Sequence, residues 1–257
     1  VDLRYVNTTA SKTKYFNSQR GSAAARLVRE LNATDQVSVN LEGQHVHFPN
    51  PGTGPGQFTP DYDSYNIYGR YQSKLAQVHI DAAVGWSKYA FDQGTPDQSG
   101  TMARARVDWE LTPSSTLGIG AVRQFTDASE QMMVDPAEIG TSIDATALGI
   151  GNSVLTPQIY LQKRIDASYA YQGPRLALSI APYYQQLEYV NDPFFDQNGP
   201  GVDFSVGYRL RPLMTLGFNA GAERIRYATL DRRDEFLSYG PSLTDQLTQH
   251  WIWQLNL

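Results

Sequence analysis

Hydrophobic residues recur at every second position along almost the whole of this chain. Between residues 75 and 86, one such series consists of Ala76, Val78, Ile80, Ala82, Val84 and Trp86, which alternate with polar or small residues. Residues 102–111, 176–184 and 202–210 repeat the pattern. Period two is the signature of a β-strand that has one apolar and one polar face. The sequence therefore predicts an all-β fold.

The alternating segments are long enough to define individual strands. We predict about twelve of them, in one domain that covers residues 1–257. They lie near residues 1–8, 20–32, 36–48, 62–73, 75–89, 100–111, 115–126, 157–171, 174–189, 201–211, 213–227 and 245–257. Residues 20–32 also suit a helix because alanine and leucine are frequent there, and we favour the strand.

Short and long connections alternate between these strands. The short turns lie at residues 32–35, 72–74, 112–114, 172–174 and 211–212, and the long loops at 9–19, 49–61, 90–99, 127–156, 190–200 and 228–244. This order is typical of an up-and-down antiparallel transmembrane β-barrel, with short periplasmic turns and long extracellular loops. Segment 127–156 is too long for a bare connection, and we expect it to form a plug or an extra hairpin.

Composition narrows the class of protein further. The chain has 257 residues, no cysteine and a net charge of −5, with acidic and basic residues interspersed. A nucleic-acid-binding protein would usually carry a basic stripe. The absence of cysteine fits an oxidising compartment. No apolar run approaches the ~18 residues of a membrane helix, and Val1 does not begin a signal peptide, so we expect a mature chain or a fragment.

A membrane explains why the apolar face would point outward. Hydrocarbon offers no hydrogen-bond partners, so a sheet within it must close on itself, with aromatic residues at the two interfaces. The aromatic residues on the predicted outer face are Tyr65, Tyr71, Trp86, Trp109, Tyr169, Tyr171, Tyr184, Tyr208, Trp251 and Trp253. The alternative is a soluble lipocalin-like barrel, whose apolar face would point inward. We favour a bacterial outer membrane barrel with both chain ends in the periplasm.

Two stretches share a further pattern. Residues 109–118 followed by 123–127, and residues 207–217 followed by 223–227, each combine a strand, a tight turn at a proline, leucine–glycine alternation and a charged stretch. The pattern resembles the outer-membrane β-barrel porins found beside exopolysaccharide gene clusters, which are loosely similar to the alginate, cellulose and Pel exporters. It covers most of residues 100–257. The resemblance implies a conduit or anchor for exopolysaccharide export, with a polysaccharide chain and periplasmic export-complex subunits as partners, and supplies no catalytic residues.

The carboxyl end departs from the usual pattern of such barrels. They commonly finish on an aromatic residue, whereas this chain finishes on Leu257. If the sequence continues beyond this point, we expect a barrel of about sixteen or eighteen strands. Outer-membrane lipid and lipopolysaccharide are the other expected partners, and nucleic acid is not one.

The polar face supplies the candidate functional residues. We predict that they line the lumen and the substrate path: Tyr68, Arg70, His79, Asp81, Arg104, Arg106, Asp108, Glu110, Arg164, Asp166, Asp203, Arg209 and Glu223. Mixed charges and tyrosines suit hydrated saccharides, because polar groups bind hydroxyls and aromatic faces stack on sugar rings. The alternative is structural: Arg104 or Arg106 would pair with Asp81 and neutralise a narrow lumen.

No sequence motif indicates an enzyme. The chain has no phosphate-binding loop, dinucleotide fingerprint, zinc-ligand spacing or nucleophile elbow. We therefore predict no catalytic residue, no cofactor and no metal. Three alternatives to export stay open: a general or small-solute porin, a structural or adhesion barrel that binds through its loops, and an outer-membrane hydrolase. A hydrolase would depend on His79 with Asp81, or on His45 and His47 near the outer rim.

Overall fold

The computed structural model describes residues 1–8, 17–50, 61–92, 96–127, 159–248 and 251–256. Thirteen strands of this part form a single sheet. They are β1 (Asp2–Thr8), β2 (Ser18–Glu30), β3 (Asp35–His47), β4 (Tyr62–Lys74), β5 (Val78–Phe91), β6 (Gln98–Thr112), β7 (Ser115–Asp127), β8 (Ile159–Gln172), β9 (Leu176–Tyr189), β10 (Gln197–Arg211), β11 (Met214–Tyr227), β12 (Arg233–Thr248) and β13 (Trp251–Asn256). One 3-10 turn, η4 (Pro193–Phe195), precedes β10.

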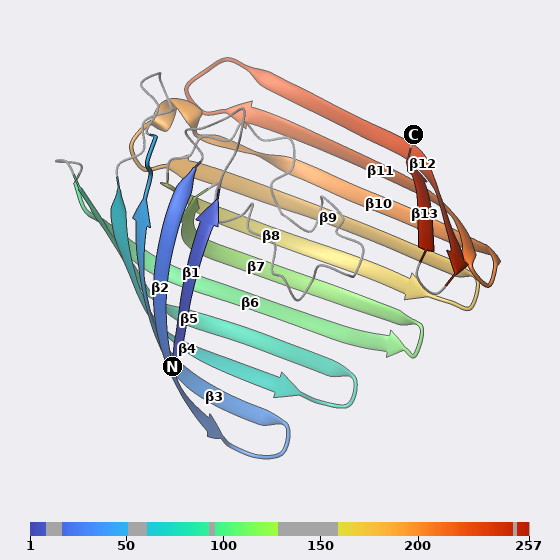
Figure 1. The fold of residues 1–257 in the computed structure, drawn as a ribbon, viewed down its shortest axis with the longest axis horizontal. Helices are drawn as coiled ribbons and strands as arrows, with labels where there is room; N and C mark the ends of the chain where they lie inside the picture. The colour runs from blue at the N-terminus through green and yellow to red at the C-terminus, as the bar shows by residue number, and fades with distance from the viewer. Residues whose placement is uncertain (9–16, 51–60, 93–95, 128–158, 249–250, 257) are drawn as a thin grey trace.

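The strands are paired strictly in chain order. Each strand pairs antiparallel with the next, from β1 to β13, and together they form one curved arc (Figure 1). The all-β, up-and-down prediction is therefore confirmed, and residues 20–32 contain a strand, β2. No helix in the described part of the chain is long and apolar enough to cross a membrane. Segment 128–158, which contains nearly all of the expected plug or hairpin, lies outside the described residues.

Short turns join the strands at one end of the sheet, as predicted. In the turn between β2 and β3, the side-chain oxygen of Asn32 accepts hydrogen bonds from the backbone N–H groups of Thr34 and Asp35, both at 2.8 Å. The backbone N–H of Leu31 donates to the Asp35 carbonyl at 2.9 Å. Asparagine side chains favour turns because they replace a backbone acceptor in this way.

The prediction for the carboxyl-terminal strands was wrong. Residues 228–244 were expected to form a long loop, but most of them belong to β12, which pairs with β11 from Met214 to Arg226. The single strand expected at 245–257 is the end of β12 followed by β13. Gly240 and Pro241 lie within β12, opposite Asn219 and Phe218. Both residue types usually disfavour strands, so local propensity concealed this one.

The polar face of the arc is the concave one. Arg106 on β6 forms an ion pair with Asp166 on β8 at 3.5 Å, across the intervening strand β7. Gln185 on β9 reaches Glu223 on β11 in the same way, with 3.3 Å between the nitrogen and the oxygen. Strands two apart in a sheet are separated by roughly 10 Å, so such contacts form where side chains converge on the inside of a curve.

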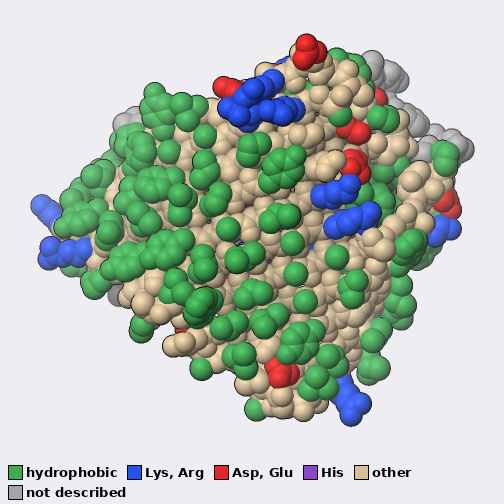
Figure 2. Space-filling model, turned by 180° about the vertical axis from the view of Figure 1, so that it is seen from behind, with side chains coloured by type: hydrophobic (Ala, Val, Ile, Leu, Met, Phe, Trp, Pro, Cys, Tyr) green, Lys and Arg blue, Asp and Glu red, His purple; other side chains and the backbone are tan. Residues whose placement is uncertain are grey.

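The convex face is apolar and exposed. Val84 is 66% exposed and Ile165 is 64% exposed, although both are aliphatic. Trp109, predicted on the outer face, is 46% exposed. Figure 2, seen from behind Figure 1, shows hydrophobic side chains spread over most of this face, with few charges among them. The predicted separation of an apolar outer face and a polar inner face is therefore present in the fold.

Among the described residues, the two buried apolar clusters lie at the end of the arc that carries the long loops. Phe48, Tyr62, Tyr89 and other buried residues pack there, and the Tyr62 and Tyr89 ring centroids are 5.6 Å apart. A second cluster joins Tyr160 to Tyr189, with centroids 5.2 Å apart. Sequence reasoning predicted a polar lumen and missed these clusters, because their tyrosines occupy positions that alternate with the apolar outer residues.

Candidate functional site

All of the predicted lining residues share the concave face. The strand register aligns several of them in a single row of directly opposed residues that crosses eight strands, from β4 to β11. The row consists of Gln72, Asp81, Arg106, Gly120, Asp166, Tyr183, Gly201 and Glu223. It brings together residues that are about 150 positions apart in the chain, which is possible because each hairpin returns the strand to the same level.

The first charged group of this row is a bidentate ion pair. Arg70 Nε donates to Asp81 Oδ1 at 2.8 Å, and Arg70 Nη2 donates to Asp81 Oδ2. Gln72 Nε2 also donates to this carboxylate, at 2.9 Å. Asp81 is therefore paired with Arg70 and not with Arg104 or Arg106, the partners considered in the structural alternative. Arg70 lies opposite Ala83, whose small side chain leaves Arg70 room to reach Asp81 diagonally.

Arg106 forms the centre of a second charged group. Its Nη2 lies 2.9 Å from Asp108 Oδ1, and its Nη1 lies 3.5 Å from Asp166 Oδ2. The glycines of β7 make this arrangement possible. A Cβ at Gly118 would lie 2.8 Å from Arg106 Nη2, and a Cβ at Gly120 would lie 2.8 Å from Asp166 Oδ1. These glycines therefore leave the space in which Arg106 on β6 pairs with Asp166 on β8.

The row of opposed residues continues onto β8 and β9. Arg164 Nε lies 3.7 Å from Asp166 Oδ1. The Arg164 guanidinium carbon lies 4.2 Å from the Tyr183 ring centroid, which is a cation–π distance. The sequence places Tyr183 on the polar face but gives no signal that an arginine from the neighbouring strand covers its ring. Tyr183 was therefore not among the predicted lining residues.

A pocket of about 300 Å3 opens within this network. Its polar lining consists of Tyr68, Arg70, Asp81, Arg104, Arg106 and Asp166. The guanidinium carbon of Arg104 lies 5.5 Å from the Tyr68 ring centroid, and its Nη2 lies 3.9 Å from Met102 Sδ. Within the part of the chain that the structure describes, no carboxylate lies within ion-pair distance of Arg104. The Tyr68 hydroxyl donates to Glu42, which sequence reasoning did not name.

The other predicted residues lie on the concave face but outside this pocket. His79 is opposite Asp108 in the register, and Glu110 is opposite Thr116. Arg209, near the short-turn end, donates from Nη1 to the Pro174 carbonyl at 3.2 Å. Two more, Asp203 on β10 and Glu223 on β11, belong to the neighbouring part of the sheet.

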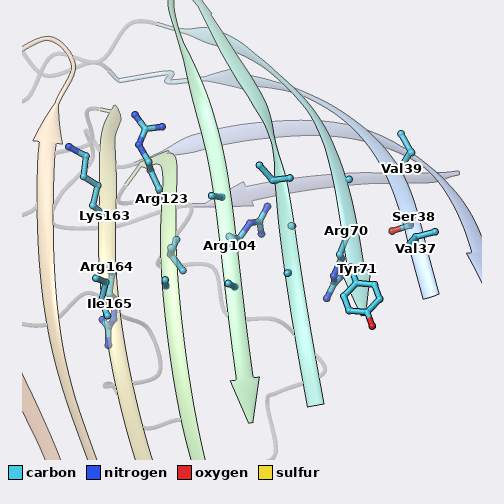
Figure 3. Close-up of a pocket in the computed structure, with 18 of the residues that line it drawn as sticks. Val37, Ser38, Val39, Arg70, Tyr71, Arg104, Arg123, Lys163, Arg164 and Ile165 are labelled. Atoms are coloured by element: carbon cyan, nitrogen blue, oxygen red, sulfur yellow. The ribbon is translucent and has the colours of Figure 1, made fainter. Parts of the chain in front are cut away.

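A shallow apolar depression of about 1050 Å3 marks the opposite, convex face. Its lining includes five small residues of β4 to β7: Gly69, Ala82, Ala103, Ala105 and Ala121. Arg123 and Lys163 are directly opposed on β7 and β8 and lie side by side at one edge of it (Figure 3). Arg70 and Tyr71, labelled next to one another in Figure 3, are consecutive residues whose side chains belong to opposite faces.

Two of the histidines that a hydrolase would use, His45 and His47, have carboxylate partners. His45 Nδ1 lies 2.9 Å from Asp63 Oδ1, and His47 Nδ1 lies 2.5 Å from Asp61 Oδ2. Both pairs belong to the end of the sheet that carries the long loops, as predicted for these histidines. Among the described residues, no group of three or more histidine, cysteine, aspartate or glutamate side chains could hold a metal ion.

Comparisons with known proteins establish the fold. No protein-family model and no curated protein matches the sequence. Solved structures do match. The FrpB iron transporter from Neisseria meningitidis (F5-1 variant) superposes with a TM-score of 0.61 at 9% identity, covering 90% of this chain and 41% of that one. The copper transporter OprC gives a TM-score of 0.55 at 13% identity, covering 89% of this chain and 41% of that one.

A third similar structure is the ferric yersiniabactin uptake receptor FyuA from Yersinia pestis. Its TM-score is 0.52 at 12% identity, with 93% of this chain and 42% of that chain covered. This chain therefore spans less than half of the length of the transporters that it resembles. The likeness concerns the fold alone and does not bear on the resemblance to exopolysaccharide porins. The chain has the fold of outer-membrane β-barrel proteins, and these neighbours are transporters and receptors rather than enzymes.

Proposed function

We propose that this chain forms a wall of an outer-membrane barrel and that hydrophilic solutes pass along its concave face. The observation that carries the proposal is the separation of the two faces of the same strands. Val107 on the convex face of β6 is 39% exposed, whereas its neighbours Arg106 and Asp108 form an ion pair on the concave face. Lipid would cover the first face, and water would fill the space beside the second.

The two edges of the arc need partners in such a membrane. In the described residues, β1 pairs with β2 and β13 pairs with β12, while the outer edge of each has no strand beside it. Unpaired backbone groups are costly in hydrocarbon, so we infer that further strands complete the barrel around this arc. The long loops would face the cell exterior, and the periplasmic location of the two chain ends stays a prediction.

We propose surface polysaccharide as the transported material, as the sequence resemblance implied. The concave face supports this cargo in two ways. Arg70 and Arg106 form ion pairs with aspartates there, and these polar groups can bind hydroxyls. Tyr68 and Tyr183 add flat aromatic faces close to these groups. FrpB, FyuA and OprC are named for iron and copper cargo, and a shared fold does not transfer that cargo to this chain.

Ion conductance across planar bilayers containing the purified full-length protein tests the proposal. We expect conductance that falls when the cognate polysaccharide is added. The Arg106→Ala and Asp108→Ala variants should assemble normally but conduct differently, whereas Val107→Ala, on the other face of the same strand, should conduct like the parent protein. Conductance that polysaccharide leaves unchanged would favour a small-solute porin. A properly inserted protein without conductance would overturn the proposed conduit.

A further inference from the structure

One arginine of the pocket on the concave face has no carboxylate partner among the described residues. Three arginines and two aspartates line it, which leaves one net positive charge when all five are ionised. Asp81 is paired with Arg70, and Arg106 lies 2.9 Å from Asp108 and 3.5 Å from Asp166. The remaining pocket arginine is Arg104, which has no carboxylate within ion-pair distance among the described residues. A single negative charge on a ligand would complete the pocket.

The surroundings of Arg104 define the chemistry of such a ligand. A guanidinium presents its N–H donors in a planar fork that matches a carboxylate in two parallel hydrogen bonds. The Tyr68 ring lies 5.5 Å from the guanidinium carbon, so a flat aromatic surface adjoins the cation. The carboxylates of Asp81 and Asp166 can accept hydrogen bonds from hydroxyl groups. A carboxylate, a ring and several hydroxyls on one molecule would use all three features.

The same surroundings disfavour a phosphate. A phosphate monoester carries close to two negative charges at neutral pH, which exceeds the single positive charge of the pocket. Its second charge would face Asp81 and Asp166 across a pocket of about 300 Å3. This volume is at the lower end of the roughly 300–1,000 Å3 typical of small-molecule sites, so it suits one sugar-sized unit.

We propose that this pocket binds the carboxylate of an acidic sugar, with Arg104 as the anchoring cation and the Tyr68 ring beside it. The proposal rests on the proposed function, because the pocket lies on the face that would line the solute path. It adds a preference among hydrophilic solutes: acidic saccharides are retained at Arg104, and neutral ones pass without being held there.

Equilibrium binding to the full-length protein in detergent tests this site directly. Glucuronate, glucose and glucose 6-phosphate are the probes, because they share a ring and hydroxyl groups but differ in charge. We expect glucuronate to bind and the other two to bind at least about tenfold more weakly. Arg104→Gln should weaken glucuronate binding by about tenfold or more, and Arg104→Lys by less, because lysine keeps the charge but lacks the planar fork.

The matched control is Arg209→Gln. Arg209 is also on the concave face, but its Nη1 donates to the Pro174 carbonyl near the short turns, away from the pocket. The substitution removes the same charge as Arg104→Gln. Because Arg209 lies outside the pocket, glucuronate binding should stay unchanged if the pocket is the site. An equal loss in both variants would show a general electrostatic effect and would overturn the proposal, as would preferential binding of glucose 6-phosphate or no binding of glucuronate.

Solute flux into proteoliposomes separates failure of this proposal from failure of the proposed function. Flux of neutral sugars without binding of glucuronate would refute the acidic-sugar site and leave the conduit intact. Glucuronate binding that depends on Arg104, with no flux of any solute, would refute the conduit and keep the site. β-Sheet circular dichroism equal to that of the parent protein confirms that each variant is folded before it is compared.

Discussion

The two faces of a single strand of this protein have opposite chemical requirements. On β6, Arg104 and Arg106 point into the concave network, while Ala105 and Val107 belong to the convex face. The backbone is the same on both sides, and only the side-chain environment differs. Arg106 is paired with Asp108 and Asp166 inside the curve, whereas an arginine in place of Val107 would face lipid. Tolerance to a charged substitution should therefore alternate from one residue of the strand to the next.

The largest effect should come from a charge placed on the convex face. Val107→Arg or Val206→Arg would put a cation against lipid, which costs about 2–4 kcal/mol near the bilayer midplane. We expect loss of assembly, measured as the fraction of protein that folds into lipid vesicles in a urea titration. Arg106→Ala, one residue from Val107, is the control and should fold like the parent protein. Equal tolerance of both classes of substitution would contradict the face assignment.

A smaller effect should follow from filling the space above β7. Gly120→Val would add a Cβ at a position 2.8 Å from Asp166 Oδ1, and the larger side chain would separate Asp166 from Arg106. Overpacking of this kind costs about 1–3 kcal/mol in unfolding free energy. Gly69→Ala is the control on the convex face, because nothing lies within 4 Å of a Cβ at that glycine. Similar stability of the two variants in vesicle unfolding would show that the Arg106–Asp166 bridge is not constrained by Gly120.

The aromatic end of the concave face allows a finer comparison. The Tyr89 hydroxyl donates to the Phe125 carbonyl at 3.1 Å, and Tyr89 is 5% exposed. Tyr89→Phe should lower the unfolding free energy by about 0.5–1.5 kcal/mol, because one partly buried hydrogen bond is lost. Tyr65→Phe, on the convex face, should change the unfolding free energy less, since Tyr65 is 54% exposed. A larger loss in Tyr65→Phe would reverse the expected difference between the two faces.

The smallest expected effect concerns a carboxyl group at the start of β10. Partial burial raises the pKa of Asp196, although the backbone N–H of Tyr189 donates to its carboxylate at 2.6 Å. A carboxyl group with a raised pKa in the folded state favours folding when protonated. Its contribution should therefore decline as pH rises from the unfolded pKa through the folded one. Asp196→Asn should flatten the dependence of stability on pH in this range, and an unchanged slope in vesicle unfolding would exclude this residue as the cause.

Most of the fold could be predicted from the sequence because period-two alternation and turn residues are local signals. The alternation around Val84 and Val107 predicted both the strands and the face that each side chain occupies. β12 could not be predicted in the same way, because Gly240 and Pro241 disfavour a strand locally and pairing with β11 overrides them. Tertiary pairing therefore decided the structure of this region, where local preference failed.

The candidate site shows the same division between local and non-local information. Alternation placed Arg104, Arg106 and Asp166 on one face, and the structure confirms that shared face. It could not identify ion-pair partners, because a partner depends on side-chain reach across strands. Asp81 pairs with Arg70 rather than with its opposite neighbour Arg106. Gly120 leaves the space that the Asp166 carboxylate occupies. These contacts become visible only when the register of all the strands is known.

Single-cysteine labelling along β5 tests the separation of the two faces most directly. The chain contains no cysteine, so each introduced thiol is the only one present. Cysteines in place of His79 and Asp81 lie on the concave face, and those in place of Ala82 and Val84 lie on the convex face. With the protein in lipid vesicles, a water-soluble thiol reagent should modify the first pair and leave the second pair protected. Modification of Ala82→Cys and Val84→Cys, with protection of the other two, would contradict the arrangement of a lipid-facing convex surface and a water-filled concave one.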